Sequence, residues 1–374
     1  MRDFPIELVN TVIENVSATA DLLCLRSVNA TCQDLVTPKV FRKLCIQNSL
    51  QSVQNFQKVL ESDTLAPHVR EVVYDLRDQE TFRLLQSSES VCSDELEIAE
   101  LEEALTEAFC ALPQFTGLES ISLNFWPKYV TQSGQEVQEQ PFWFTNRQLT
   151  VLHAVHHAMR TSRASSLSLN NVVLMSSACY DFVSSLTNSP LSHLALSVVG
   201  NGEVSPWSGS KSLNGSLGSL LPPSNSKLSS LVLRSPMGLY HSPASQLSSF
   251  TYPSLQSLVV ENIMFDHVSS DGVEAFIARH KHSLRRLELR SCASYVAGDS
   301  TGNAHWSAIW ERLRSELTNL EELVVDSGSQ GYARLDPTLG YIPHIKLDSE
   351  RAEDDMKAFQ EFYAFLKTRK CIVA

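Results

Sequence analysis

Eight short stretches of the chain alternate apolar and polar residues in the way that predicts β-strands. Most of them read L-x-x-L-x-L followed by a polar residue, so one face of each strand carries leucines. The stretches are 69–76, 118–125, 165–172, 191–198, 228–235, 255–262, 284–291 and 320–327. The leucine anchors recur after 27 residues from Leu167 to Leu194 and after 29 residues from Leu258 to Leu287, which indicates an internal repeat.

Helical patterns fill several of the intervals between these strands. Apolar residues recur three and four positions apart in 95–112, 147–160, 271–282 and 305–317. Alternation of strand and helix predicts an α/β fold with parallel strands and right-handed crossovers. A repeat of about 20–29 residues with one short strand each is typical of leucine-rich repeats. We therefore expect residues 49–374 to form an irregular leucine-rich-repeat solenoid with a parallel sheet on its concave face.

Three segments do not follow this repeat. Residues 126–146 are polar and predict a long loop, held in part by the aromatic residues 142–144. Residues 200–227 are rich in Ser, Gly and Pro and predict a mobile insertion. Residues 353–370 predict an amphipathic helix that caps the end of the solenoid.

The first 48 residues predict a separate unit of three short helices. Residues 4–16 carry apolar positions at helical spacing, beginning with a proline. Ser17 or Thr19 is expected to cap the second helix, and Pro38 is expected to end the third. A unit of this size buries little surface, so we expect it to need a partner or a neighbouring domain.

Composition limits the classes of partner. The formal net charge is −12 and the pI is about 5.4, which argues against a nucleic acid or an anionic membrane as the main partner. The chain shows neither an N-terminal signal sequence nor a run of about 18 apolar residues, so we expect no transmembrane helix. The eight cysteines form no C-x-x-C pair, which favours reduced thiols in an intracellular protein, cytoplasmic or nuclear.

The order of residues in the N-terminal unit resembles the F-box family. The residues that carry this resemblance are Phe4-Pro5-Ile6-Glu7-Leu8, Val12-Ile13, Asp21-Leu22-Leu23-Cys24-Leu25-Arg26-Ser27-Val28 and Asp34-Leu35-Val36-Thr37-Pro38-Lys39-Val40-Phe41. The later repeats, with SLRRLELRSC and a helix containing Trp306 and Trp310, are similar to fungal F-box proteins with leucine-rich repeats. The resemblance implies that the N-terminal unit binds the Skp adaptor of a ubiquitin ligase with a cullin scaffold, and that the repeats bind a protein substrate.

The resemblance also implies which residues contact the adaptor. By their positions in the motif these are Phe4, Pro5, Leu8, Ile13, Leu22, Leu23, Leu25 and Val28. The alternative for each of them is a place in the unit's own core. Cys32 stands near the position where the family usually has a large aromatic residue, so we expect a weaker adaptor contact than is usual.

The residues between the leucines line the other face of the predicted sheet. Six charged residues among them are candidates for contact with a target: Arg234, Glu261, Arg286, Glu288, Arg290 and Asp326. One row across the strands alternates in sign, and neighbouring strands lie about 4.8 Å apart. These side chains therefore either pair with one another or bind a polar protein partner. Neither interpretation favours nucleic acid.

The sequence contains few patterns that indicate catalytic chemistry. His153 and His157 share a helix face and two such imidazoles can hold a metal, but no HExxH pattern or nearby carboxylate accompanies them. We expect a solvated or core-edge face there instead. The chain has no P-loop, no G-x-G-x-x-G after a strand and no G-x-S-x-G. We therefore expect no catalytic residue, no metal and no cofactor.

The last four residues, CIVA, fit a prenylation motif centred on Cys371. Lys367, Arg369 and Lys370 precede it, as a second membrane signal would. The alternative is that this segment is buried as part of the capping helix. A second hypothesis for the whole chain follows from the motif, namely a leucine-rich scaffold outside any ligase, tethered to a membrane through Cys371.

Overall fold

The computed structural model of the chain divides into two compact units. Unit 1 comprises Met1–Asn124 and His157–Ser165, and unit 2 comprises Phe125–His156 and Ser166–Ala374. The structure describes residues 5–76, 91–125, 142–173, 186–187, 189–199, 220–235, 247, 249–265, 272–295, 305–326, 331–336, 340–343 and 349–373. Most of the two predicted insertions, 126–141 and 200–219, lies outside the described residues.

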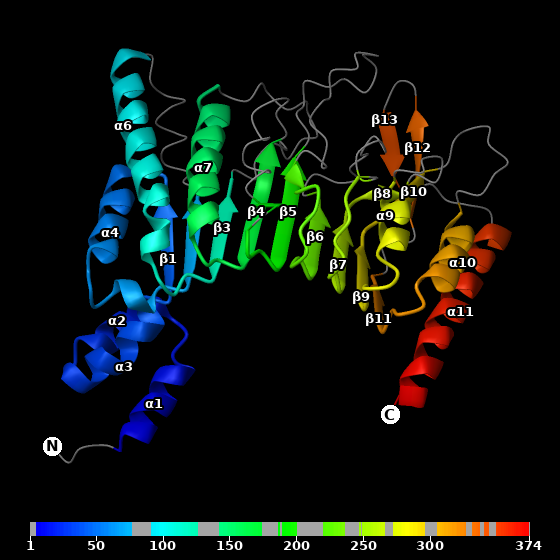
Figure 1. The fold of residues 1–374 in the computed structure, drawn as a ribbon, viewed down its shortest axis with the longest axis horizontal. Coiled ribbons are helices and arrows are strands. Elements are labelled where there is room, and N and C mark those ends of the chain that lie inside the picture. The colour runs from blue at the N-terminus through cyan, green and yellow to red at the C-terminus, as the bar shows by residue number, and fades with distance from the viewer. Residues whose placement is uncertain are drawn as a thin grey trace. The chain divides into compact units, whose positions relative to one another are not determined.

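Unit 1 begins with three short helices, drawn in dark blue in Figure 1: α1 (Ile6–Asn15), α2 (Thr19–Arg26) and α3 (Ala30–Val40). The predicted cap of α2 is wrong, because Ala18 occupies the N-cap position and no side chain bonds there. The predicted end of α3 is also wrong, because Pro38 lies inside the helix. It stands in the last turn, so the missing N–H removes a bond from a helix that has almost ended.

A three-stranded parallel sheet follows in unit 1. Strand β2 (Glu71–Asp75) lies between β1 (Lys43–Gln47) and β3 (Ser120–Asn124). The accompanying helices are α4 (Leu50–Leu60), α6 (Val91–Cys110) and the 3-10 turns Ala66–His68 and Leu112–Gln114. Strands β2 and β3 were predicted, whereas β1 and α4 were not. The sheet therefore begins at Lys43, inside the range that the sequence assigned to the N-terminal domain.

Unit 2 carries six parallel strands in the order β4 to β7, β9 and β11. Their bounds are Ser166–Val173, His193–Val199, Ser230–Arg234, Ser257–Glu261, Arg286–Arg290 and Glu322–Val325. The register pairs Leu231 with Leu258 and Leu258 with Leu287, so the leucine anchors form one buried row. The eight predicted strands and their parallel direction are confirmed.

The predicted helices are present with shifted ends. Besides α6 of unit 1, they are α7 (Phe142–Thr161), which spans the division between the units, α9 (Val273–Arg279), α10 (Trp306–Glu316) and the C-terminal α11 (Ser349–Val373). The loop predicted for 126–146 is wrong at its end, because helix α7 begins at Phe142 and includes all three aromatic residues. Among the described residues, no helix is sufficiently long and apolar to cross a lipid bilayer.

A second, smaller sheet in unit 2 was not predicted. Its order is β13 (Gly340–Pro343), β12 (Gly331–Asp336), β10 (Ala293–Tyr295) and β8 (Met264–Phe265). Asn262 and Ser291, the residues directly after β7 and β9, have positive φ, and so does Asn171 inside β4, where the register shifts. Asparagine tolerates this conformation, and Asn262 Nδ2 also donates to the Ser235 carbonyl of the preceding strand's end at 2.8 Å. A residue with positive φ thus follows both β7 and β9.

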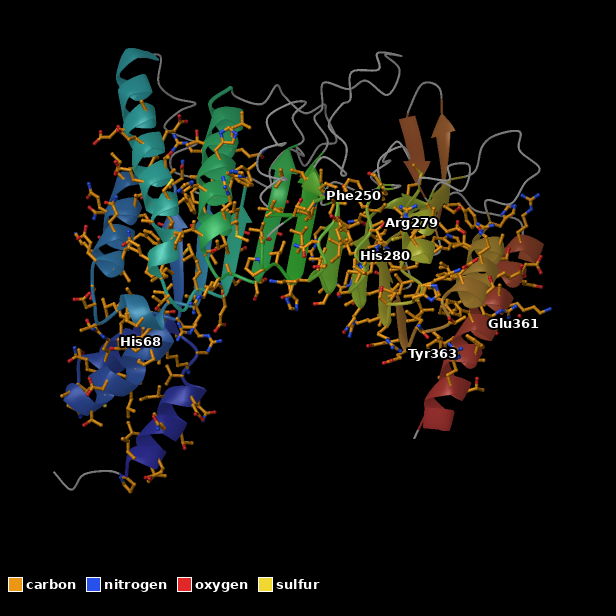
Figure 2. The ribbon with its side chains drawn as sticks, viewed as in Figure 1. His68, Phe250, Arg279, His280, Glu361 and Tyr363 are labelled. Atoms are coloured by element: carbon orange, nitrogen blue, oxygen red, sulfur yellow. The ribbon has the colours of Figure 1, made fainter. Side chains whose placement is uncertain are left out.

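His280 joins the end of α9 to the segment before β7 (Figure 2). Its Nε2 accepts the backbone N–H of Tyr252 at 2.9 Å, and its Nδ1 lies 2.7 Å from the Phe276 carbonyl. This arrangement requires the proton on Nδ1 and none on Nε2. Burial lowers the pKa of His280, so the imidazole is a neutral part of the core.

Helix α11 packs against α10 through aromatic side chains, and Glu361 of α11 also pairs with Arg314 at 2.6 Å (Figure 2). The rings of Trp306 and Trp310 stack, and Phe359 contacts Trp310. Asp355 of α11 is buried and accepts the N–H of Ser307, in the first turn of α10, at 2.7 Å. The predicted C-terminal helix is therefore present and packed on its neighbour.

Candidate functional site

Large apolar side chains are exposed on and just after the first two helices. Exposed fractions are 50% for Ile6, 55% for Leu8, 56% for Val12, 46% for Leu23 and 64% for Val28. We call these five residues the exposed apolar set. Among the described residues, only Met356 and Tyr363 are other large hydrophobic residues with comparable exposure. Concentration of such residues in one small unit is typical of a protein-binding surface.

The same three helices also have a core of their own. Ile13, Leu22 and Val36 are buried, and Val9 and Leu25 pack against them in partly buried positions. Helix α1 is therefore apolar on two sides, because Val9 and Ile13 face this core while Leu8 and Val12 lie in solvent. The exposed apolar set is thus not needed to hold the three helices together.

The predicted adaptor contacts divide between surface and core. Pro5, Leu8, Leu23 and Val28 are exposed, whereas Ile13 and Leu22 are buried and Leu25 is half-buried. Phe4 lies outside the described residues.

Sequence reasoning did not select Ile6 or Val12, although both stand inside the quoted motif. The i, i+4 spacing of Leu8 and Val12 was the signal that joins Val12 to the exposed side of α1.

Lys39 of α3 holds the end of α1. Its Nζ donates to the carbonyls of Ile13 at 2.6 Å, Glu14 at 3.1 Å and Val16 at 3.0 Å. The last carbonyls of a helix lack partners within the helix, and a cation there also favours the helix dipole. Lys39 therefore fixes the orientation of the helix that carries Leu8 and Val12.

Replacing Lys39 with methionine should loosen α1 without unfolding the chain. The carbonyls would lose a charged donor, and we expect a local loss of about 1–2 kcal/mol. Hydrogen exchange of the α1 amides should accelerate roughly tenfold. Lys58→Met, at an exposed position in α4, is the control. Unchanged α1 exchange in Lys39→Met would show that apolar packing alone holds the helix.

Charged side chains form a network on one face of the unit 2 sheet. The register aligns Arg234, Glu261 and Arg290 in one row, and Arg286 with Glu322 in another. Ion-pair distances are 3.6 Å for Arg234–Glu261, 3.9 Å for Arg290–Glu261 and 3.1 Å for Arg286–Glu322. Pairing between neighbouring strands, one of the two alternatives for these residues, is therefore present.

Glu288 is the centre of this network. Arg286 contacts its carboxylate at 3.1 Å and Arg290 at 2.5 Å, and the side chain is only 6% exposed. Burial raises the pKa of Glu288, but the hydrogen bonds from Arg290 and Arg286 outweigh burial and hold the pKa below its usual value. Asp326, at the end of the row, accepts the backbone N–H of Ser291 at 3.0 Å. All six predicted target contacts are thus engaged with neighbouring groups on this face.

Glu288→Gln should remove a pH-dependent contribution to stability. A carboxyl whose pKa is lowered by folding stabilises the fold above its unfolded pKa of about 4.3, and this contribution is lost as pH falls through the folded value. The variant should be less stable by about 1 kcal/mol near neutral pH, and the difference should shrink toward about pH 3. Denaturant unfolding at both pH values measures it. Glu321→Gln, whose Arg285 pair is exposed, should show a smaller difference. An equal, pH-independent loss in both variants would contradict the assignment.

The remaining candidates show no site geometry. His153 and His157 are both exposed on α7. In the part of the chain that the structure describes, no cluster of three His, Cys, Asp or Glu residues is placed to hold a metal. The side chain of Cys371 lies outside the described residues.

Comparison with known proteins adds no assignment. No protein-family model matches the chain, and no curated protein matches its sequence. The exposed apolar set and the charged face of the unit 2 sheet are the two candidate binding surfaces among the described residues.

Proposed function

We propose that this chain is the substrate-recognition subunit of a Skp–cullin–F-box ubiquitin ligase. Its N-terminal helices bind the Skp adaptor, which connects the chain to the cullin scaffold, and its repeats bind a protein target. The subunit itself is not catalytic, because the ubiquitin transfer takes place on partner subunits. The observation that carries the proposal is the exposed apolar set, on helices that already have their own core.

The repeats support the second half of the proposal. Residues 284–292 read L-x-x-L-x-L-x-x-C, the pattern of a leucine-rich repeat, and Cys292 occupies the position that this pattern gives to Asn or Cys. Its buried thiol lies 3.4 Å from the Val260 carbonyl of the preceding strand, and burial raises its pKa to about 12. A protonated thiol that donates to the neighbouring repeat suits a structural position.

The charged face of the unit 2 sheet supplies a surface for the target. Arg286 and Arg290 are each nearly half exposed, although both pair with carboxylates. A target would therefore meet guanidinium groups that are held in place by their partners, which lowers the entropy cost of binding. Ser230 and Ser257 in the same rows have small side chains, so the backbone of a target could come close to β6 and β7 there.

Binding of the full-length chain to a purified Skp adaptor tests the proposal. Size-exclusion chromatography should show a one-to-one complex, and calorimetry should give a Kd below about 1 μM, because an apolar interface of standard size reaches this range. Adding the cullin scaffold should give a ternary complex. Failure of the folded chain to bind the adaptor would overturn the proposal.

Deleting residues 1–48 is not a suitable test, because it would also remove strand β1 from the sheet. Point substitutions on the helices keep that strand.

A further inference from the structure

A hollow of about 380 Å³ lies between α2 and α3. It is lined by Leu23, Arg26, Ser27, Asn29, Ala30 and Gln33. Leu23 belongs to the exposed apolar set, and Val28 lies in the chain between two lining residues. The hollow is open to solvent, since five of its six lining residues are exposed and only Arg26 is half-buried. The hollow therefore adjoins the surface proposed to bind the adaptor.

The polar groups of this hollow are mainly donors, and its lining contains no carboxylate. Arg26 is held by two contacts, since its Nε donates to Thr37 Oγ1 at 2.9 Å and its guanidinium lies 5.4 Å from the centre of the Phe41 ring. Its two terminal nitrogens have no hydrogen-bond partner among the described residues. The guanidinium is thus positioned and still able to bind an anion.

Two side-chain amides add to this donor set. Asn29 uses its Oδ1 to accept the Cys32 N–H at 2.8 Å, so its NH₂ group remains for another partner. The Gln33 amide makes no hydrogen bond with the part of the chain that the structure describes. Ser27, by contrast, donates its hydroxyl to the Cys24 carbonyl at 2.7 Å. One guanidinium and two side-chain amides can bind a carboxylate, and the neighbouring leucine can pack on the methylene groups that carry this carboxylate.

We propose that this hollow binds an aspartate or glutamate side chain of the adaptor, with Arg26 as the charged partner and Leu23 covering the methylene groups. The proposal rests on the proposed function and adds the chemistry of one contact within it. Apolar burial of the exposed set would supply affinity, and the acid in the hollow would fix the register of the two proteins.

Gln33 offers a clean test, because its side chain has no bond to lose within the described residues. Gln33→Glu places a negative charge in the hollow, and Gln33→Lys places a positive one. Binding of each full-length variant to the purified Skp adaptor is measured by calorimetry at low and high salt. Gln33→Glu should weaken binding about tenfold, and Gln33→Lys should leave it unchanged or strengthen it by about twofold to fivefold. Both differences should shrink in high salt.

Gln54 supplies matched controls, since it is exposed on α4 outside the hollow and its Glu and Lys variants change the net charge equally. Neither Gln54 variant should alter binding by more than about twofold. An Asp-to-Lys and Glu-to-Lys scan of the adaptor should contain one variant that restores binding to Gln33→Glu.

The outcomes separate the two proposals. Equal affinities for both Gln33 variants and the wild type would overturn the acid contact and leave the adaptor complex standing. Stronger binding by Gln33→Glu and weaker binding by Gln33→Lys would indicate a basic occupant and would also overturn it. Equal weakening by both variants would show a contact governed by shape, against the proposal. If the wild-type chain does not bind the adaptor, both proposals fall together.

Discussion

Substituting Leu8 and Val12 together with aspartate should weaken binding to the Skp adaptor at least a hundredfold. Both side chains are more than half exposed on one side of α1, and neither belongs to the core formed by Ile13, Leu22 and Val36. Burial of each at an interface contributes roughly 1.5–3 kcal/mol, and a desolvated carboxylate in the same place opposes binding further. A hundredfold change corresponds to about 2.7 kcal/mol, so even the lower estimate reaches it. Calorimetry with the full-length variant measures the effect.

The same double variant should unfold at nearly the same denaturant concentration as the wild type, because surface substitutions away from the core change stability little. Met356→Asp is the matched control, since Met356 is 46% exposed on α11 and outside the exposed apolar set. It should bind the adaptor normally. Unchanged binding by the Leu8 and Val12 variant would exclude α1 as the contact. Leu22→Asp is not informative, because a charge at this buried position would disrupt the three helices themselves.

Replacing Asp355 with alanine should destabilise the C-terminal end of unit 2 by about 3 kcal/mol. Asp355 accepts the hydroxyl of Tyr332 and the backbone N–H of Ser307, and it is 4% exposed. The Tyr332 hydroxyl oxygen in turn accepts the backbone N–H of Trp306 at 2.8 Å. Burial, reinforced by Asp355, raises the pKa of Tyr332, so this hydroxyl remains a donor at physiological pH. Removal of the carboxylate would leave the buried Tyr332 hydroxyl and the part-buried Ser307 N–H without this acceptor.

Denaturant unfolding followed by tryptophan fluorescence measures this loss. Trp306 and Trp310 report on it because their rings stack with each other, and Trp310 contacts Phe359 of α11. Asp354→Ala removes the same group one position earlier, where the side chain is exposed, and should cost little. Asp355→Asn keeps one acceptor oxygen, so its loss of stability should lie between those of Asp355→Ala and Asp354→Ala. A loss below about 1 kcal/mol for Asp355→Ala would show that aromatic packing alone fixes α11.

Eight strands were predictable because each carries apolar residues in a two-residue alternation, which long insertions between the strands do not interrupt. The register that aligns Leu231, Leu258 and Leu287 follows from that alternation, since a slip by one residue would expose every leucine. The four strands of the smaller sheet were missed because none of them carries the L-x-x-L-x-L pattern. Strand β1 does alternate Leu44 and Ile46, and this short pattern was overlooked. Helix α4 was different, since Val53, Phe56 and Leu60 stand at helical spacing and the pattern was overlooked.

The candidate surfaces were less predictable than the strands. Leu22 and Leu23 are equally apolar in sequence, and only the packing of α2 against α3 decides that one is buried and the other exposed. The alternating row of charges did indicate pairing between strands. The central role of Glu288 did not follow from it, because Glu288 stands in another row and is reached by two arginines of its own strand. Such a contact depends on side-chain direction, which a sequence pattern does not specify.

Because α1 is apolar on two sides, it also affects the stability and turnover of copies of the chain that are not bound to a partner. Unassembled copies display leucine and valine side chains of the kind that chaperones and proteases recognise. A partner that covers them stabilises the folded chain by mass action, in proportion to the partner's concentration over its Kd. The steady-state amount of the protein in a cell is therefore expected to follow the supply of its partner, with surplus copies removed by quality control.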